Sequence, residues 1–257
     1  MIFSEQSDIT IVITSCGRFE LLKQTLDSLN EYNTYPINKI IITEDSGSNK
    51  IYEVLPQNWK NNCYVVINNQ KLGQLKSIDL AYNLVDTKYI FHCEDDWVFY
   101  RSGFIEDSLT ILELDDNVLQ VWLRDYQSDV SKNYPFHYPS QRKIIGDISY
   151  SRLESNDPIW KGFSFNPGLR RKSDYNEIKP YNRNKSACET EGDISKLYYD
   201  KGMFAVILDR SAVEHIGWDS HILTGKEIIL IRKKRIKKIK YIAIGFILGC
   251  IFMFFLK

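Results

Sequence analysis

Cysteine is scarce in the sequence, and its placement excludes several kinds of site. There are five cysteines, an odd number, and none of them belongs to a CxxC pair. A disulfide framework or a zinc site would need paired or closely spaced cysteines. We therefore expect reduced thiols, as in a cytosolic compartment, and the pattern supports no nucleophilic role for any of them.

The start of the chain lacks the pattern of a secretory signal peptide. Residues 1–8 are polar, and the first apolar run, residues 9–13, is only as long as a strand. The 257 residues suit one large α/β domain or two small ones. The 16 Tyr, 13 Phe and 5 Trp favour a folded enzyme or binding protein over a disordered chain.

The formal net charge is zero, but the charge is unevenly distributed. Residues 226–257 contain nine Lys or Arg against one acidic residue, a net charge of +8, so residues 1–225 carry −8 because the whole chain is neutral. An acidic body of this kind is not expected to bind nucleic acid.

The C-terminal segment has the features of a membrane anchor. Sixteen uncharged residues, 241–256, lie between the basic cluster 232–240 and Lys257. As a helix they would span about 24 Å, and Lys240 and Lys257 can snorkel to cover the remaining hydrocarbon thickness. The alternative is a buried C-terminal helix, although the adjacent positive charges do not suit a soluble core. We predict a domain at residues 1–225, a basic juxtamembrane segment at 226–240 and a single-pass anchor at 241–257, with the N-terminal body in the cytoplasm.

Strands and helices alternate along the chain. The apolar run 9–14 leads through a turn into residues 19–30, where leucines recur at helical spacing. The polar stretches 125–158 and 170–187 are expected to be long loops, with a short aromatic strand and turn at 159–169. This α/β alternation predicts a mostly parallel sheet with helices on both faces. Further strands are expected at 37–43, 63–67, 88–93, 118–124 and 203–208, and helices at 72–85, 104–114 and 189–199.

The triplet Glu94-Asp95-Asp96 ends one of the predicted strands. Neighbouring carboxylates repel one another, and a divalent metal or a ring of hydrogen-bond donors would compensate them. A solvated turn after the strand is the simpler alternative. In a parallel sheet, however, ligands bind beyond the carboxyl ends of the strands. Residues 15–18, Asp45 and the triplet all fall at such ends, which favours a binding site.

These pieces, in this order, resemble the GT-A glycosyltransferases, most closely those of family 2. The resemblance covers about residues 9–217 and implies a Rossmann-like GT-A domain. It rests on Ile11-Val-Ile-Thr-Ser-Cys-Gly-Arg18, Ile40-Ile-Ile-Thr-Glu-Asp45, the helix entered through Gly73, Glu94-Asp95-Asp96-Trp97 and the helix that contains Glu189-Thr190-Glu191.

The resemblance implies a role for the acidic triplet as the family's DXD motif. Asp96 would ligate Mn²⁺ or Mg²⁺, while Glu94 and Asp95 would contact the nucleotide-sugar and help to hold the metal. Hard oxygen ligands suit such a cation. Glu94 departs from the aspartate that is commoner at this position. His215 resembles a late histidine that adds a metal ligand in some members.

The same resemblance implies that other residues contact the nucleotide-sugar donor. Asp45 matches the aspartate that contacts the base, and Arg18 would pair with it or approach the nucleotide, beside Ser15 in the same turn. Lys76 would face the phosphates from the helix entered through Gly73. For each charged residue, a capping or solvated role is the alternative.

The remaining candidates concern the acceptor. The resemblance makes Glu191, eleven residues before Gly202, the catalytic base, with Glu189 close enough to compete for the role; both also suit a helix N-terminus electrostatically. Aromatic faces stack on sugar rings, so Trp160, Phe163 and Asn166 are candidates for the acceptor pocket, with core packing as the alternative.

The resemblance implies a metal-dependent, inverting, hexosyltransferase-type enzyme. It would move a sugar from a UDP- or GDP-sugar to a hydroxyl of a glycan, lipid or protein. One alternative is a sugar-nucleotide pyrophosphorylase, although the turn Thr14-Ser-Cys-Gly-Arg18 has a single glycine where that reaction expects a glycine-rich loop. The other is a catalytically inactive binding or scaffold module.

Overall fold

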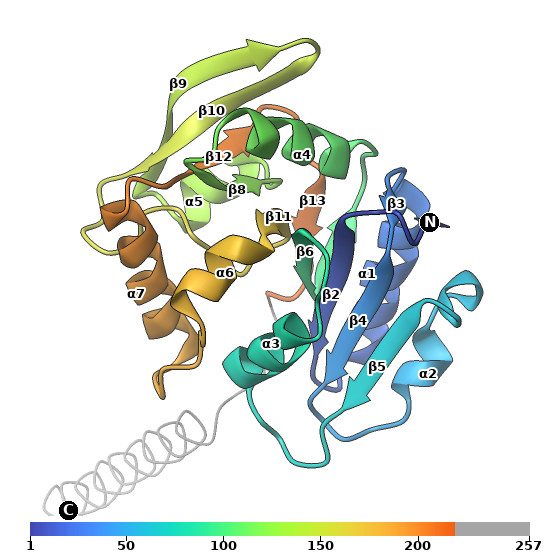
Figure 1. Cartoon of the computed structure of the whole chain (residues 1–257). Coiled ribbons are helices and arrows are strands. Elements are labelled where there is room, and N and C mark those ends of the chain that lie inside the picture. Colours follow the sequence, from blue (N-terminus) through green and yellow to red (C-terminus); the bar gives the residue numbers. More distant parts are fainter. Residues whose placement is uncertain (219–257) are drawn as a thin grey trace, which may run out of the picture. The chain divides into compact units, whose positions relative to one another are not determined.

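The computed structural model describes residues 1–218, and residues 1–216 form one compact unit. Figure 1 shows this unit as a layered α/β structure. The predicted basic segment 226–240 and anchor 241–257 lie outside the described residues. Between residues 1 and 218, no helix is long and apolar enough to cross a bilayer.

A five-stranded sheet runs through the middle of the unit. Its strand order is β11-β6-β2-β4-β5. All neighbours are parallel except β11, which runs antiparallel to β6. The first strand, β2, is buried along its whole length because β-branched residues fill both of its faces. The bounds are β2 (Ile9–Ser15), β4 (Lys39–Glu44), β5 (Cys63–Ile67), β6 (Tyr89–Glu94) and β11 (Gly168–Arg171).

Alternating residues of β2 contact different helices on the two faces of the sheet. Ile11 and Ile13 share a core with the leucines of α1 and with α4, whereas Val12 packs with α3 and α7. The sheet is therefore covered on both sides, as the sequence predicted. The helices are α1 (Phe19–Tyr32), α2 (Ile51–Val54), α3 (Gln74–Asn83), α4 (Phe104–Leu114), α6 (Lys172–Ile178) and α7 (Ala187–Asp200).

A second, mixed sheet has the strand order β8-β12-β10-β9. Strand β12 is parallel to β8 and antiparallel to β10, which forms a hairpin with β9. Two short ladders, β1-β3 and β13-β7, complete the strands of the described part. The bounds are β1 (Ile2–Phe3), β3 (Pro36–Ile37), β7 (Trp97–Phe99), β8 (Val118–Trp122), β9 (His137–Ile145), β10 (Ile148–Ser155), β12 (Phe204–Leu208) and β13 (Val213–His215).

The predicted long loops are wrong in part. Residues 125–158 contain a π-helix, η2 (Tyr126–Val130), the short α5 (Ser131–Asn133) and the β9-β10 hairpin, which projects from the unit in Figure 1. Most of β9 is exposed, so its sequence shows no apolar alternation. Residues 170–187 include the end of β11 and all of α6. The strand expected within 159–169 is also wrong, since β11 begins only at Gly168.

Among the glycines of residues 1–218, Gly162 is predicted to tolerate a side chain least. Its φ is +112°, and an added Cβ would lie 2.8 Å from the Ala205 Cβ. Gly162→Ala should lower the free energy of unfolding by about 2–4 kcal/mol through backbone strain and overpacking. Gly146→Ala is the matched control, because its φ is +55° and nothing lies within 4 Å of the added Cβ. Urea unfolding measures both changes, and equal losses would contradict the steric argument.

Candidate active site

The carboxyl ends of β2, β4 and β6 meet at one edge of the central sheet. Thr14 is in register with both Thr43 on β4 and Glu94 on β6. The polar residues that follow these strands therefore lie close together, as expected from the parallel order. They form the candidate site, and most of the carboxylates in it are buried.

Arg18 is the cation that joins the last two carboxylates of the triplet. Its Nη1 lies 2.8 Å from the Asp96 Oδ2, and its Nη2 pairs with the Asp95 carboxylate. The Cys16 N–H donates to the Asp95 Oδ2 at 3.3 Å. On the other side, the His215 Nε2 lies 3.2 Å from the Asp96 Oδ2. Arg18 thus contacts the triplet, and the expected alternative pairing with Asp45 is not formed.

The three neighbouring carboxyl groups have different proton affinities. Burial and the nearby Asp96 and Glu191 carboxylates raise the pKa of Glu94 well above its ordinary value. Burial also raises the pKa of Asp95, despite the charge of Arg18. For Asp96, the hydrogen bond from His215 and the charge of Arg18 outweigh burial, and its pKa is lowered. Asp96 is therefore the member of the triplet that is most readily ionised.

Glu44 is a buried carboxylate of this edge that the sequence reasoning missed. Its Oε2 accepts a hydrogen bond from the Ser15 hydroxyl at 2.7 Å. Its Oε1 accepts from the backbone N–H of Gly17 at 3.0 Å and of Ser46 at 2.8 Å. Glu44 therefore shapes the turn that presents Arg18. Its position directly before Asp45 was the available signal.

The Asp45 carboxylate is engaged by the loop before α3. It accepts from the N–H groups of Leu72 and Gly73 at 2.7 and 2.8 Å and from the Asn68 side chain at 2.8 Å. Lys76 lies on the exposed face of α3. The same helix carries Gln74, another residue missed from the sequence, whose amide donates to the Glu94 carboxylate.

The side chains around Asp96 are of the kinds that ligate a divalent cation. The Asp96 Oδ1 is buried and has no hydrogen-bond partner within the described part of the chain. Among residues 1–218, no group of three or more His, Cys, Asp and Glu is arranged to hold a metal by itself. Mg²⁺ sites in nucleotide-using enzymes commonly need only one or two carboxylates, because substrate phosphates complete the shell. Asp96, with Glu94 and His215 beside it, meets that smaller requirement.

The two glutamates of α7 are in different environments. Glu189 forms a capping box with Ser186: the Ser186 N–H donates to Glu189 Oε2 at 3.0 Å and the Glu189 N–H to the Ser186 Oγ at 3.2 Å. Glu191 accepts from the Phe165 N–H at 2.7 Å. Burial raises the pKa of Glu191 to about 7, and its charge acts on Glu94. Of the two, Glu191 therefore faces the triplet.

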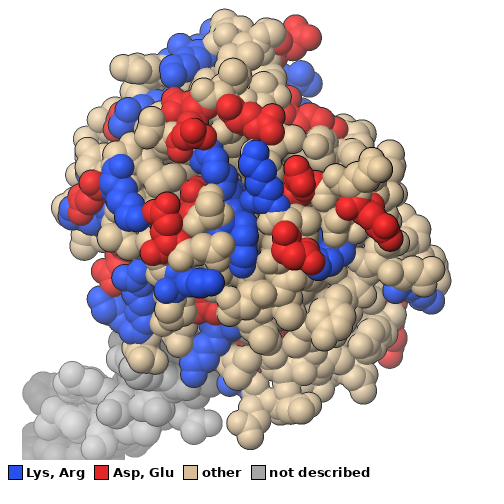
Figure 2. Space-filling view, in the orientation of Figure 1, with Lys and Arg blue, Asp and Glu red and all other residues tan. Residues whose placement is uncertain are grey.

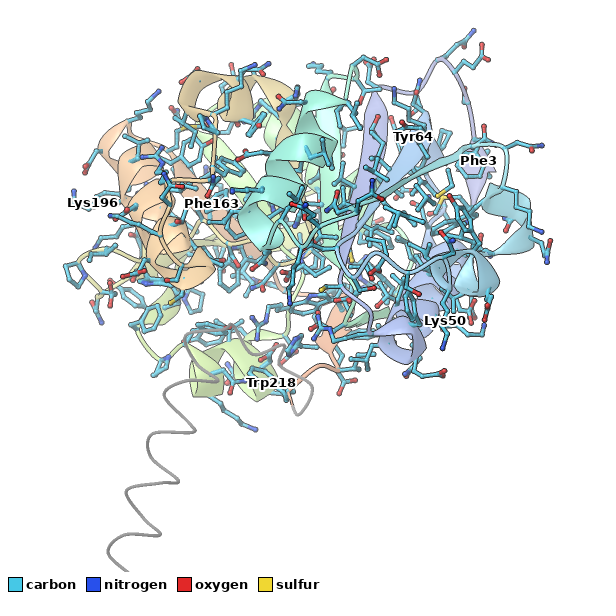
Figure 3. All side chains as sticks on the ribbon, turned by 90° about the horizontal axis from the view of Figure 1, so that it is seen from below. Phe3, Lys50, Tyr64, Phe163, Lys196 and Trp218 are labelled. Carbon is cyan, nitrogen blue, oxygen red and sulfur yellow. The ribbon has the colours of Figure 1, made fainter. Side chains whose placement is uncertain are left out.

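The three expected acceptor residues have separate structural roles. Phe163, labelled in Figure 3, is 2% exposed and packs against Phe165, Tyr181 and Tyr198. Its ring is therefore part of the core. The side chain of Trp160 is partly exposed, and the ring lies 6.3 Å from that of Phe136. The Asn166 backbone carbonyl accepts from Gln120 at 3.4 Å.

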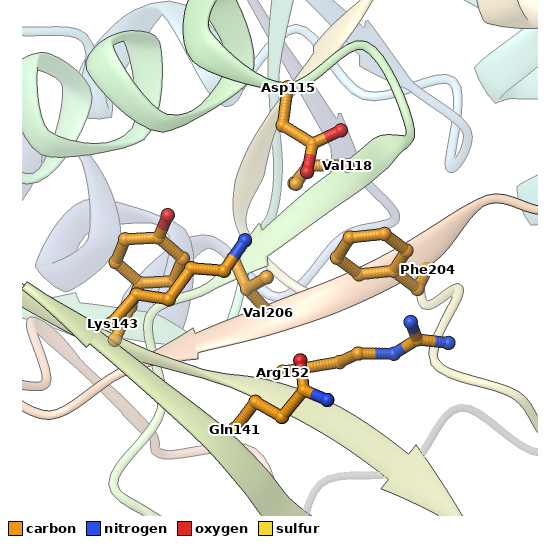
Figure 4. A pocket seen from close by; sticks show the side chains of 8 residues that line it. Asp115, Val118, Gln141, Lys143, Arg152, Phe204 and Val206 are labelled. Atoms are coloured by element: carbon orange, nitrogen blue, oxygen red, sulfur yellow. The ribbon is translucent and has the colours of Figure 1, made fainter.

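Neither the charges on the face shown in Figure 2 nor the cavity on the second sheet singles out this edge. Figure 2 shows basic and acidic side chains interspersed on one face. A cavity of about 210 Å³ lies on the second sheet, where Lys143, Arg152, Tyr150 and Phe204 are among its lining residues (Figure 4). None of the candidate site residues lines it. The carboxylates, rather than the cavity, define the candidate site.

Two solved structures share the fold of this chain. One is described as the mannosyltransferase PcManGT from Pyrobaculum calidifontis in complex with GDP-Man and Mn²⁺, with a TM-score of 0.62 and 11% identity over 84% of this chain and 60% of that chain. The other is S. aureus TarS 1–349, with a TM-score of 0.56 and 13% identity over 80% of this chain and 59% of that chain. This chain therefore spans about 60% of their length, and at these identities the likeness shows the fold.

Sequence comparison identifies the family. Comparison with curated proteins gives no match. The profile of glycosyl transferase family 2, in contrast, matches residues 10–176. That range is well over half of the chain and holds the turn at Arg18, Asp45 and the acidic triplet. The chain belongs to glycosyl transferase family 2.

Proposed function

We propose that the protein is a metal-dependent inverting glycosyltransferase of the hexosyltransferase type. It transfers a sugar from a UDP- or GDP-sugar to a hydroxyl of a glycan, lipid or protein. The observation that carries the proposal is the placement of Glu191, whose pKa is near neutrality, beside the acidic triplet at the end of β6. Family membership and the two GT-A neighbours support it.

The residues divide the chemistry between donor and acceptor. Glu191 accepts the proton of the acceptor hydroxyl as the oxygen attacks the anomeric carbon, while the bond from that carbon to the diphosphate oxygen breaks. A divalent cation held by Asp96, with Glu94 and His215, neutralises charge on the diphosphate when bound. Arg18 holds Asp95 and Asp96 in place. Attack opposite to the leaving group inverts the anomeric centre.

The donor is tested by thermal shift. UDP-, GDP- and CMP-sugars are added to the full chain with and without Mn²⁺. One UDP- or GDP-sugar should raise the melting temperature in the presence of Mn²⁺, because a ligand that binds only the folded state stabilises it. The GDP-Man in the PcManGT structure makes GDP-sugars a first choice. Absence of a shift with every donor would favour the scaffold alternative.

Asp96→Asn should remove the Mn²⁺-dependent part of this thermal shift. Asn keeps the size of the side chain but loses the charge that a hard cation needs. Glu113→Gln is the matched control, because Glu113 is an exposed acid of α4 outside the site. Retention of Mn²⁺-dependent donor binding in Asp96→Asn would exclude Asp96 as a ligand.

Glu191→Gln should lower kcat by about a hundredfold or more, with donor binding retained, because the general base is lost. The wild-type rate should rise with pH through about 7, since the Glu191 carboxylate must be ionised to take a proton and burial raises its pKa to about 7. Glu189→Gln is the matched control on the same helix and should keep most of the activity. Initial rates are measured over a range of pH for the wild type and both variants. Normal turnover in Glu191→Gln would show that another residue is the base.

We also propose that residues 241–257 anchor the protein to a membrane, with the catalytic domain at 1–225 in the cytoplasm. The proposal rests on the uncharged run and the adjacent basic segment. Full-length protein should sediment with membranes and resist carbonate extraction, whereas a chain ending at residue 225 should be soluble and active. Carbonate release of the full chain would contradict the anchor.

A further inference from the structure

The loop 161–166 is held by buried side chains from three elements. From β8, Gln120 accepts from the Ser164 N–H at 3.2 Å and Trp122 donates to the Gly162 carbonyl at 2.8 Å. From α7, the Ser195 hydroxyl accepts from the Phe163 N–H at 3.1 Å. The loop is thereby fixed as the element that presents its next N–H, that of Phe165, to Glu191.

Arg170 holds the loop from the third element, β11. Its Nη2 donates to the carbonyl oxygens of Ser164 and Asn166 at 3.1 and 3.3 Å, on both sides of Phe165. The guanidinium lies 5.3 Å from the centre of the Phe163 ring. Arg170 is only 2% exposed, and among residues 1–218 its Nε and Nη1 have no hydrogen-bond partner and it forms no ion pair with a carboxylate. A buried cation without such a partner is costly, which calls for a functional reason.

Charges from several elements act on Glu191. Arg170 on β11 and Arg124 after β8 favour its ionised form, and so do the Phe165 N–H and the Ser164 hydroxyl. Glu94 on β6 opposes ionisation. Cys188 and Glu189 lie on the same helix as Glu191. Arg124 already has a carboxylate partner, Asp129, at 2.6 Å.

We propose that Arg170 is a positioning residue for the catalytic base: it clamps the carbonyls of Ser164 and Asn166 so that the Phe165 N–H holds the Glu191 carboxylate. The positive charge of Arg170 acts on the same carboxylate. Its catalytic consequence rests on the proposed glycosyl transfer. The clamp and the charge coupling are properties of the folded protein and are measurable without turnover.

Arg170→Met tests the proposal, with Arg171→Met as the matched control. Arg171 is the next residue of β11 and is also largely buried, but it bonds to the Val118 carbonyl at 2.7 Å and not to the loop. Arg170→Met should lower kcat by roughly tenfold or more, with KM for the donor nearly unchanged, because the base is displaced and less ionised. The rise of rate with pH should move upward by about 0.5–1 pH unit. Arg170→Lys keeps the charge, so its pH profile should stay close to that of the wild type.

A stability measurement detects the effect of the Arg170 charge on Glu191 without any need for enzymatic turnover. Because the pKa of Glu191 is raised on folding, its contribution to stability is present below the unfolded pKa and is lost as pH rises through about 7. The melting temperature of Glu191→Gln minus that of the wild type should therefore grow with pH and become constant above about pH 7. We call the pH at which this difference becomes constant the levelling point. When both proteins also carry Arg170→Met, the levelling point should lie at higher pH, and when both carry Arg171→Met it should not change.

The outcomes separate the two proposals. If no donor is turned over but the levelling point moves with Arg170, the proposed function fails and the charge coupling stands. If activity exists and neither the pH profile nor the levelling point moves, Arg170 is merely structural and the inference is overturned. Should Arg170→Met fail to fold, Arg170→Gln and Ser164→Ala replace it. Ser164→Ala removes a hydroxyl that accepts from the Asn166 N–H at 3.1 Å and that favours the ionised form of Glu191. An unchanged levelling point in both variants also overturns the inference.

Discussion

The ion pairs of Arg18 with Asp95 and Asp96 are the interaction on which the site depends. Parallel pairing of β2 and β6 forces the acidic end of β6 against the turn after β2, where both aspartates are buried. Two adjacent buried carboxylates would repel each other without a fixed cation. Loss of one partner of a buried pair typically costs about 3–5 kcal/mol. Glu44, which bonds to the N–H of Gly17, holds the turn that carries Arg18.

A second constraint is the partial burial of Glu191. The carboxylate faces the acidic triplet, so repulsion and burial both work against its charge. Among residues 1–218, the Phe165 N–H, the Ser164 hydroxyl and the charges of Arg170 and Arg124 oppose them. The balance leaves its pKa near neutrality, where a general base is most effective. The loop 161–166 and α7 therefore affect the proton affinity of Glu191, although neither belongs to the edge formed by the ends of β2, β4 and β6.

The central sheet and its edge were predictable because their signals are local. Apolar runs of strand length, leucines at helical spacing and acids at strand ends identify β2, α1, β4 and β6 without knowledge of contacts. The β9-β10 hairpin was missed because nearly all of β9 is exposed. Phe163 could not be distinguished from an acceptor residue, because an aromatic residue in a loop has the same sequence signature whether it faces the core or the solvent.

The sequence by itself determined the α/β order, the family resemblance and the residues that end each strand. Tertiary structure decided how those residues are paired: Arg18 with the triplet, Asp45 with the loop before α3, and Glu191 rather than Glu189 toward Glu94. It also brought Arg170 and Gln120 to one loop, where both donate to the Asn166 carbonyl. The reason is physical: pairing and burial depend on contacts between residues far apart in the chain, and local patterns carry no information about which distant charge will be nearest.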